Sequence, residues 1–234
     1  MLYEYGLLTG YSKIHIRSDS REAISEAIKE IKRHIKALSD YIRYNPHFQY
    51  LLEPLDTDLK APLIVRRMIE ASMVAGVGPM ASVAGAIADL GLEALLKNGA
   101  EIALVEDGGE ISAYTTSEDI TISVLTGEPH FSGRIGFLVG KCDSPLGIGT
   151  STGKAKWTIS FGEADSVTVV AENAAIADAA ATSICNAVTG LDVEKSISRG
   201  LERARGIRGV RGAIIIREEY AGLIGKLPKI IKVK

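Results

Sequence analysis

The stretch that decides the fold is Glu101-Ile-Ala-Leu-Val-Glu106, followed by Asp107-Gly108-Gly109-Glu110. Four consecutive apolar residues indicate a short buried strand, and the acidic glycine pair after them predicts a tight turn. Working outward, the apolar spacing from about Met80 to Asn98 predicts a helix, with Gly99 placed as a left-handed cap at its C-terminal end. We therefore expect a small-residue helix that is followed directly by a buried strand.

The remaining elements come partly in blocks. Ile24, Ile28, Ile31, Ile35, Leu38 and Ile42 form one apolar stripe on a helix that starts near Asp19 or Ser20 and stops before Pro46, and we interpret the stripe as a core seam. Further helices are expected over 63–75, 173–188 and 191–205. Expected strands are 101–106, 111–115, 119–125, 134–141, 157–161, 166–171 and 211–217. Blocks of this kind favour an α+β class, with mixed or antiparallel sheets and packed small-residue helices.

We expect a single domain over 1–234. It comprises an N-terminal hairpin and long helix (1–50), a motif-bearing core (about 60–190) and a C-terminal helix and strand (191–234).

Composition narrows the class of protein. The 234 residues carry 27 Lys+Arg against 29 Asp+Glu, a formal charge of −2, and 46% of them are hydrophobic. This balance argues against a nucleic-acid binder and indicates a protein with a substantial core. Two cysteines exclude a cysteine-rich secreted fold. We see no signal peptide in 1–17, and the uncharged run 71–88 consists of small residues typical of packed helices. We therefore expect a cytoplasmic protein without membrane contact.

Two glycine-rich stretches are candidate phosphate sites. Gly76-Val-Gly78 begins a G-x-G-x-x-A pattern, but a helix precedes it where a dinucleotide-binding fold requires a strand. The amides at the next helix start would still favour an anion near Gly78. The second stretch, Gly147 to Lys154, fails the P-loop spacing. Its hydroxyl-rich part predicts either a loop that binds phosphate or carboxylate, or a plain turn: Thr150, Ser151, Thr152 and Gly153.

Carboxylates supply the other candidate chemistry. Glu106 and Asp107, with Gly108, Gly109 and Glu110, place three acids around one tight turn, which suits either ligand or metal contact or an ordinary hairpin turn. Asp178 and Thr182, spaced i,i+4 in an alanine-rich helix, project from one face. Their oxygens suit a hard cation such as Mg²⁺.

Other sequence patterns say less about function. Histidines and cysteines form no metal cluster, and no nucleophile motif is present, so the residues alone assign no catalytic group. The string Ala-Ile-Ala-Asp occurs at 86–89 and again at 175–178. Four residues do not establish a duplication, and we interpret the repetition as chance in alanine-rich helices.

Taken in order, five segments resemble the ApbE family of flavin transferases. They are Ala84-Gly-Ala-Ile-Ala-Asp89, the strand and turn 103–111, Thr150-Ser-Thr-Gly153, Ser166-Val-Thr-Val-Val170 and Ala177-Asp178-Ala-Ala-Ala-Thr182. The run 75–81 and the segment 41–48 resemble more closely an uncharacterised prokaryotic family of the ApbE-like superfamily. The resemblance covers about residues 40–190.

The resemblance implies an ApbE-like fold and a cleft that takes FAD or FMN with Mg²⁺. It places the family's metal-binding Asp and Thr at Asp178 and Thr182. In the transferases, FAD is split and FMN is passed to a Thr or Ser of an acceptor protein. This chain departs from them at Ala84, where they have Lys, and at Glu106 to Glu110, where they have N-x-G-G-D. Only the 12 residues 154–165 stand where they have a longer segment with a His-Ile-x-Asp-Pro motif.

Two hypotheses follow, beside a third option of an unrelated hydrolase that acts on a small phosphorylated metabolite through the loop from Gly149 to Gly153. The first is an ApbE-like protein that binds a flavin nucleotide or another small phosphorylated ligand with a divalent metal. FMN transfer or FAD pyrophosphate cleavage is then the first reaction to test, with catalytic residues unassigned. The alternative is a non-catalytic assembly protein, such as a homodimer, that keeps the fold and uses the helix from Ile24 to Ile42 or the basic C-terminal region as an interface.

Overall fold

The computed structural model describes residues 1–10, 12–124, 135–154 and 160–233. Within them, an eight-stranded sheet has the order β1-β2-β3-β4-β7-β8-β9-β10, and every neighbouring pair is antiparallel. The strands of this large sheet are β1 (Tyr3–Thr9), β2 (Ser12–Ser18), β3 (Ile102–Asp107), β4 (Glu110–Thr115), β7 (Leu146–Ser151), β8 (Ser166–Ala171), β9 (Val210–Arg217) and β10 (Tyr220–Gly225). A small sheet has the order β11-β6-β5 and comprises β5 (Ile120–Val124), β6 (Ile135–Val139) and β11 (Lys229–Lys232).

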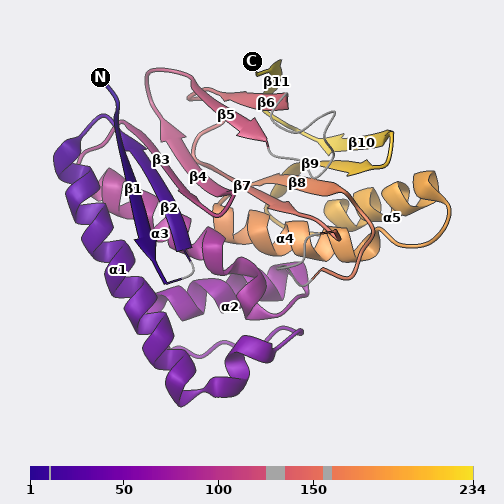
Figure 1. Cartoon of the computed structure of the whole chain (residues 1–234), viewed down its shortest axis with the longest axis horizontal. Helices are drawn as coiled ribbons and strands as arrows, with labels where there is room; N and C mark the ends of the chain where they lie inside the picture. The colour runs from indigo at the N-terminus through magenta and orange to yellow at the C-terminus, as the bar shows by residue number, and fades with distance from the viewer. Residues whose placement is uncertain (11, 125–134, 155–159, 234) are drawn as a thin grey trace.

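Helices cover one face of the large sheet, and the small sheet lies on the other (Figure 1). The helices are α1 (Arg21–Tyr44), α2 (Leu63–Ala75), α3 (Val83–Lys97), α4 (Ala174–Ala187) and α5 (Val193–Arg205), with 3₁₀ turns at Pro46–Tyr50 and Pro79–Ser82. Ser20 caps α1, since its hydroxyl accepts from the Ala23 N–H. The stretch Pro79–Lys97 is long and apolar enough to cross a membrane, but 67% of it is buried in the protein, as in a core helix.

Strand alternation separates two cores. Val105, Val169 and Ile215 point toward the helices, while Leu104, Val170 and Ile214 point toward the small sheet. The stripe on α1 packs into the helix-side core, with Ile24, Ile31 and Leu38 buried and Ile28, Ile35 and Ile42 partly buried. The interpretation of the stripe as a core seam is therefore confirmed.

The two halves of the large sheet follow the same plan. A strand pair is followed by helices and then by a second strand pair, first from β1 to β4 and again from β7 to β10. The halves join where β4 pairs with β7, and α3 and α4 pack against each other. The repeated Ala-Ile-Ala-Asp string does not mark equivalent places, because α3 precedes the second strand pair of its half while α4 follows the first.

Most expected elements are present, and one interpretation was wrong. Residues 147–151 were expected to form a loop or turn, yet Leu146–Ser151 is the central strand β7. Gly147 and Gly149 stand where a strand usually has branched apolar residues, because the α4 backbone lies too close to these two positions to allow a side chain. Strands β10 and β11 were not expected, and the strand expected at 157–161 lies largely outside the described residues.

Candidate functional site

A cavity of about 360 Å³ opens between the large sheet and the helix layer at the junction of the two halves. It is built from the segment after α1, the turn before α3, the first residue of β4, the end of β7 and one face of α4. Its described lining is Gln49, Leu51, Leu52, Val77, Gly78, Met80, Ala81, Val83, Ala84, Glu110, Thr150, Ser151, Ser160, Phe161, Asp178, Thr182 and Asn186. We call this hollow the Asp178 cavity.

Glycines in β7 bring α4 close enough to present its side chains to the cavity. A Cβ at Gly147 would lie 2.0 Å from the Asn173 carbonyl carbon, and one at Gly149 would lie 2.6 Å from the Asp178 nitrogen. Since real Cβ atoms do not approach backbone this closely, only glycine permits the contact. The run of alanines on α4 serves the same close packing, with Ala177 and Ala181 buried.

Asp178 and Thr182 both line the cavity from α4, one helical turn apart. The Gly85 N–H, in the first turn of α3, donates to Asp178 Oδ2 at 3.0 Å. Burial raises the pKa of the Asp178 carboxyl well above its ordinary value, and the neighbouring Glu110 carboxyl raises it further. The protein surroundings of the Asp178 carboxyl therefore disfavour its charged form.

Glu110 lines the same cavity from β4 and is 9% exposed. Burial raises the pKa of its carboxyl to about 7; the Asp107 and Glu106 carboxyls also raise it, while the Thr150 N–H lowers it by donating to the carboxylate. Among the lining residues that the structure describes there is no Lys, Arg or His. The described side chains that line the Asp178 cavity thus include two acids and no base.

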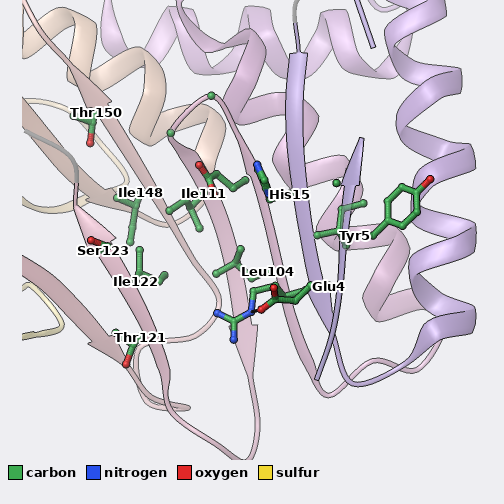
Figure 2. A pocket seen from close by; sticks show the side chains of 16 residues that line it. Glu4, Tyr5, His15, Leu104, Ile111, Thr121, Ile122, Ser123, Ile148 and Thr150 are labelled. Carbon is green, nitrogen blue, oxygen red and sulfur yellow. Dashed lines mark ion pairs between the residues drawn. The ribbon is translucent and has the colours of Figure 1, made fainter. Parts of the chain in front are cut away.

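A second cavity of about 650 Å³ lies on the opposite face of the large sheet. In Figure 2, Glu4 and His15 approach it from the hairpin β1–β2, the Tyr5 ring points away from it, and Thr121, Ile122 and Ser123 lie on β5. Leu104, Ile111 and Ile148 lie between these two walls. Glu4 pairs with Arg17, whose Nε lies 2.9 Å from the Glu4 carboxylate. Thr150 borders both cavities.

The expected site residues divide among three places. Five line the Asp178 cavity: Gly78, Thr150, Ser151, Asp178 and Thr182. Three line only the second cavity: Glu106, Gly108 and Gly109. Four line neither cavity: Gly76, Asp107, Thr152 and Gly153.

The residues outside both cavities have structural contacts. Gly76 ends α2 with φ +67°, a conformation that favours glycine. Asp107 accepts from the Ser12 hydroxyl at 2.9 Å, and the Gly153 N–H donates to the Ala164 carbonyl at 3.0 Å.

Gly78, which lines the Asp178 cavity, permits two segments of the chain to approach closely, since a Cβ there would lie 1.8 Å from the Leu51 oxygen. The helix expected at Met80 begins instead at Val83, after a short 3₁₀ turn.

Sequence reasoning did not select several cavity residues. Glu110 was noted as one of three acids around the β3–β4 turn, but only the strand alternation sends its side chain toward α4 while Glu106 faces the second cavity. Ser160 and Asn186 had no recognisable pattern. The Ser160 hydroxyl lies 2.7 Å from that of Ser151, and Asn186 Oδ1 accepts from the Phe161 N–H at 2.7 Å. These contacts join segments that are distant in sequence.

The donor set suits a hard cation only in part. Asp178, Thr182 and Glu110 offer oxygen atoms, the ligand type that Mg²⁺ prefers. Across the described part of the chain, no three His, Cys, Asp or Glu side chains are grouped closely enough to hold a metal ion by themselves. A cation at Asp178 would therefore complete its coordination with backbone, hydroxyl, water or ligand oxygens.

This chain matches one family model and a set of curated relatives that share one family name. The family model described as AbpE bacteria matches residues 5–208. The UPF0280 protein of Methanothermobacter thermautotrophicus is 40% identical over 232 residues, which cover 96% of this chain and 86% of that protein. The UPF0280 protein of Methanopyrus kandleri is 36% identical over 236 residues, which cover 100% of this chain and 95% of that protein.

Solved structures share the fold at low identity. A variant of the flavin transferase ApbE from Vibrio cholerae superposes with a TM-score of 0.62 at 14% identity, covering 96% of this chain and 97% of that one. The apo form of the flavinyl transferase ApbE from Pseudomonas stutzeri gives a TM-score of 0.61 at 13% identity, covering 96% and 94%. The expected ApbE-like α+β fold is confirmed.

Proposed function

Because the chain belongs to the AbpE bacteria family and has the fold of the ApbE flavin transferases, we propose that the Asp178 cavity binds a flavin nucleotide together with a divalent cation. One observation carries the proposal. Two acidic side chains, Asp178 and Glu110, line a cavity whose described lining has no basic side chain. The ionised Asp178 and Glu110 carboxylates would repel a phosphate-bearing ligand unless a cation came with it.

Asp178 and Thr182 would hold the cation from α4, and the phosphates would complete its coordination. A divalent cation so placed neutralises phosphate charge and stabilises negative charge on a leaving group. The Ser151 side chain lies on the same wall and offers a hydroxyl group. Leu52, Met80 and Phe161 add apolar surface that suits the ring of a nucleotide.

The first test is a fluorescence titration of FAD with purified protein in Mg²⁺ and in EDTA. We expect saturable quenching that requires Mg²⁺, and we expect Asp178→Asn to lose at least about tenfold in affinity in Mg²⁺, because a neutral amide binds the cation poorly. Asp56→Asn, at an exposed position outside the cavity, is the matched control and should bind FAD like the wild type. Absence of wild-type binding at high micromolar FAD with Mg²⁺ would sink the proposal.

The reaction that we propose to test is FMN transfer or FAD pyrophosphate cleavage. Both break the bond between the two phosphates of FAD and expel AMP. The FMN phosphoryl group is passed to a protein hydroxyl in the first reaction and to water in the second. Ala84 lines the cavity where the transferases have Lys, so this chain lacks one positive group that they carry. AMP release during incubation with FAD and Mg²⁺ would support catalysis, whereas binding without AMP would leave a flavin-binding protein.

A further inference from the structure

Asp89, on α3, is a buried carboxylate outside the Asp178 cavity. It is 6% exposed and accepts three hydrogen bonds. The Ser112 hydroxyl and the Ala174 N–H donate to Oδ1 at 2.7 and 2.8 Å, and the Ala175 N–H donates to Oδ2 at 2.9 Å. No ion pair of Asp89 occurs among the residues that the structure describes. Burial raises the pKa of its carboxyl, while the hydrogen-bond donors and the start of α4 favour the charged form.

The two amides belong to the first turn of α4, where backbone N–H groups have no partner inside the helix. Asn173 caps the same turn from within the chain, accepting from the Ile176 N–H at 2.9 Å. Asp89 adds a second cap from a different helix. Because two of its three bonds go to backbone atoms, Asp89 fixes the position of α4 along its axis.

The connection between the helices is reciprocal. The Gly85 N–H, in the first turn of α3, donates to Asp178 on α4, while Asp89 on α3 accepts from the first turn of α4. The helices approach closely at this point, since a Cβ at Gly85 would lie 2.2 Å from the Ala174 oxygen. Asp178 lies one helical turn beyond Ala174. Any shift of the α4 start is therefore passed directly to Asp178.

We propose that Asp89 is a positioning residue for the cation site, holding the first turn of α4 so that Asp178 and Thr182 lie at the cavity. The inference rests on the proposed function, because it concerns the same site. Asp89 touches neither the cation nor the nucleotide and acts through Asp178. Outer groups that orient metal ligands in this way change metal affinity by about 10–100-fold when they are replaced.

The test is the Mg²⁺ concentration that gives half-maximal FAD quenching, measured for Asp89→Asn. The amide nitrogen of Asn cannot accept from a helix N–H, so α4 loses one bond at its start. We expect the Mg²⁺ midpoint to rise at least about tenfold. In an Asp178→Asn background the same substitution should not change the Mg²⁺ dependence further, which a general loss of stability would not reproduce.

Ser112→Ala is the milder variant, and it keeps the test valid if Asp89→Asn fails to fold. It removes the Ser112 hydroxyl that donates to Asp89, and we expect the Mg²⁺ midpoint to rise about two- to threefold. Unchanged midpoints in the folded variants, with Mg²⁺-dependent binding in the wild type, would overturn the role of Asp89 and leave the proposed function intact. Absence of Mg²⁺-dependent binding in the wild type would overturn both.

Discussion

At the scale of single residues, Glu110 is a carboxyl group whose burial disfavours its charged form. Its folded-state pKa is about 7, against an ordinary value of 4.5, and burial is the main cause. Between these two pH values the folded protein holds a proton that the unfolded chain has released. The free energy of unfolding therefore falls as pH rises from about 4.5 to about 7, by roughly 3 kcal/mol in all.

We expect Glu110→Gln to remove this pH dependence. Without divalent cations the variant should be more stable than the wild type at pH 8, by up to about 3 kcal/mol, and equally stable at pH 4. Urea unfolding at both pH values measures the difference, and Glu53→Gln, at an exposed position, is the control. A difference of the same size at both pH values would contradict the buried-carboxyl explanation.

At the scale of elements, the contact between α4 and β7 decides whether the site forms. Gly147 faces the Asn173 and Ala174 backbone, and a Cβ there would meet three backbone atoms within 2.0–2.2 Å. Backbone atoms cannot rotate away as a side chain can. The strand or the helix must therefore move, and packing along α4 is lost with it.

We expect Gly147→Ala to lower the free energy of unfolding by about 3 kcal/mol or more. Gly6→Ala is the control, since a Cβ on β1 at that position would meet nothing within 4 Å, and its effect should stay within about 0.5 kcal/mol. Denaturant unfolding of both variants measures these changes. Equal stability of the two variants would mean that α4 and β7 accommodate the methyl group.

At the scale of the whole molecule, the Asp178 cavity lies where the two halves of the chain meet. Glu110 and Ala84 come from the first half, and Thr150 and Asp178 come from the second. A ligand held by both halves binds the folded protein and not the unfolded chain, so it adds its binding free energy to the stability of the fold.

FAD with Mg²⁺ should therefore raise the melting temperature. At a ligand concentration about 100 times Kd the stabilisation is about 2.7 kcal/mol, which corresponds to roughly 5–10 °C for a chain of this size. Thermal unfolding with FAD and either Mg²⁺ or EDTA measures it, and the shift should disappear in EDTA and in Asp178→Asn. An equal shift in EDTA would show that FAD binds without the cation.

Periodic patterns were sufficient for the local structure. The stripe from Ile24 to Ile42 predicts α1, the apolar run 101–106 predicts β3, and the i,i+4 spacing of Asp178 and Thr182 places both on one face of α4, because each follows from the repeat of a single element. The ordered motifs also indicated the ApbE-like fold. Each periodic pattern is short-range, because the residues that form it are neighbours along the chain.

Only the tertiary structure decided which groups share the cavity. Glu110 joins Asp178, while Glu106, four residues earlier, faces the second cavity on the other side of the sheet. Residues 146–151 form a central strand rather than a loop, since α4 packs on the glycines that make the segment look irregular. Asp89 acts on an element 85 residues away. Such outcomes depend on contacts between distant segments, which no local pattern of residues contains.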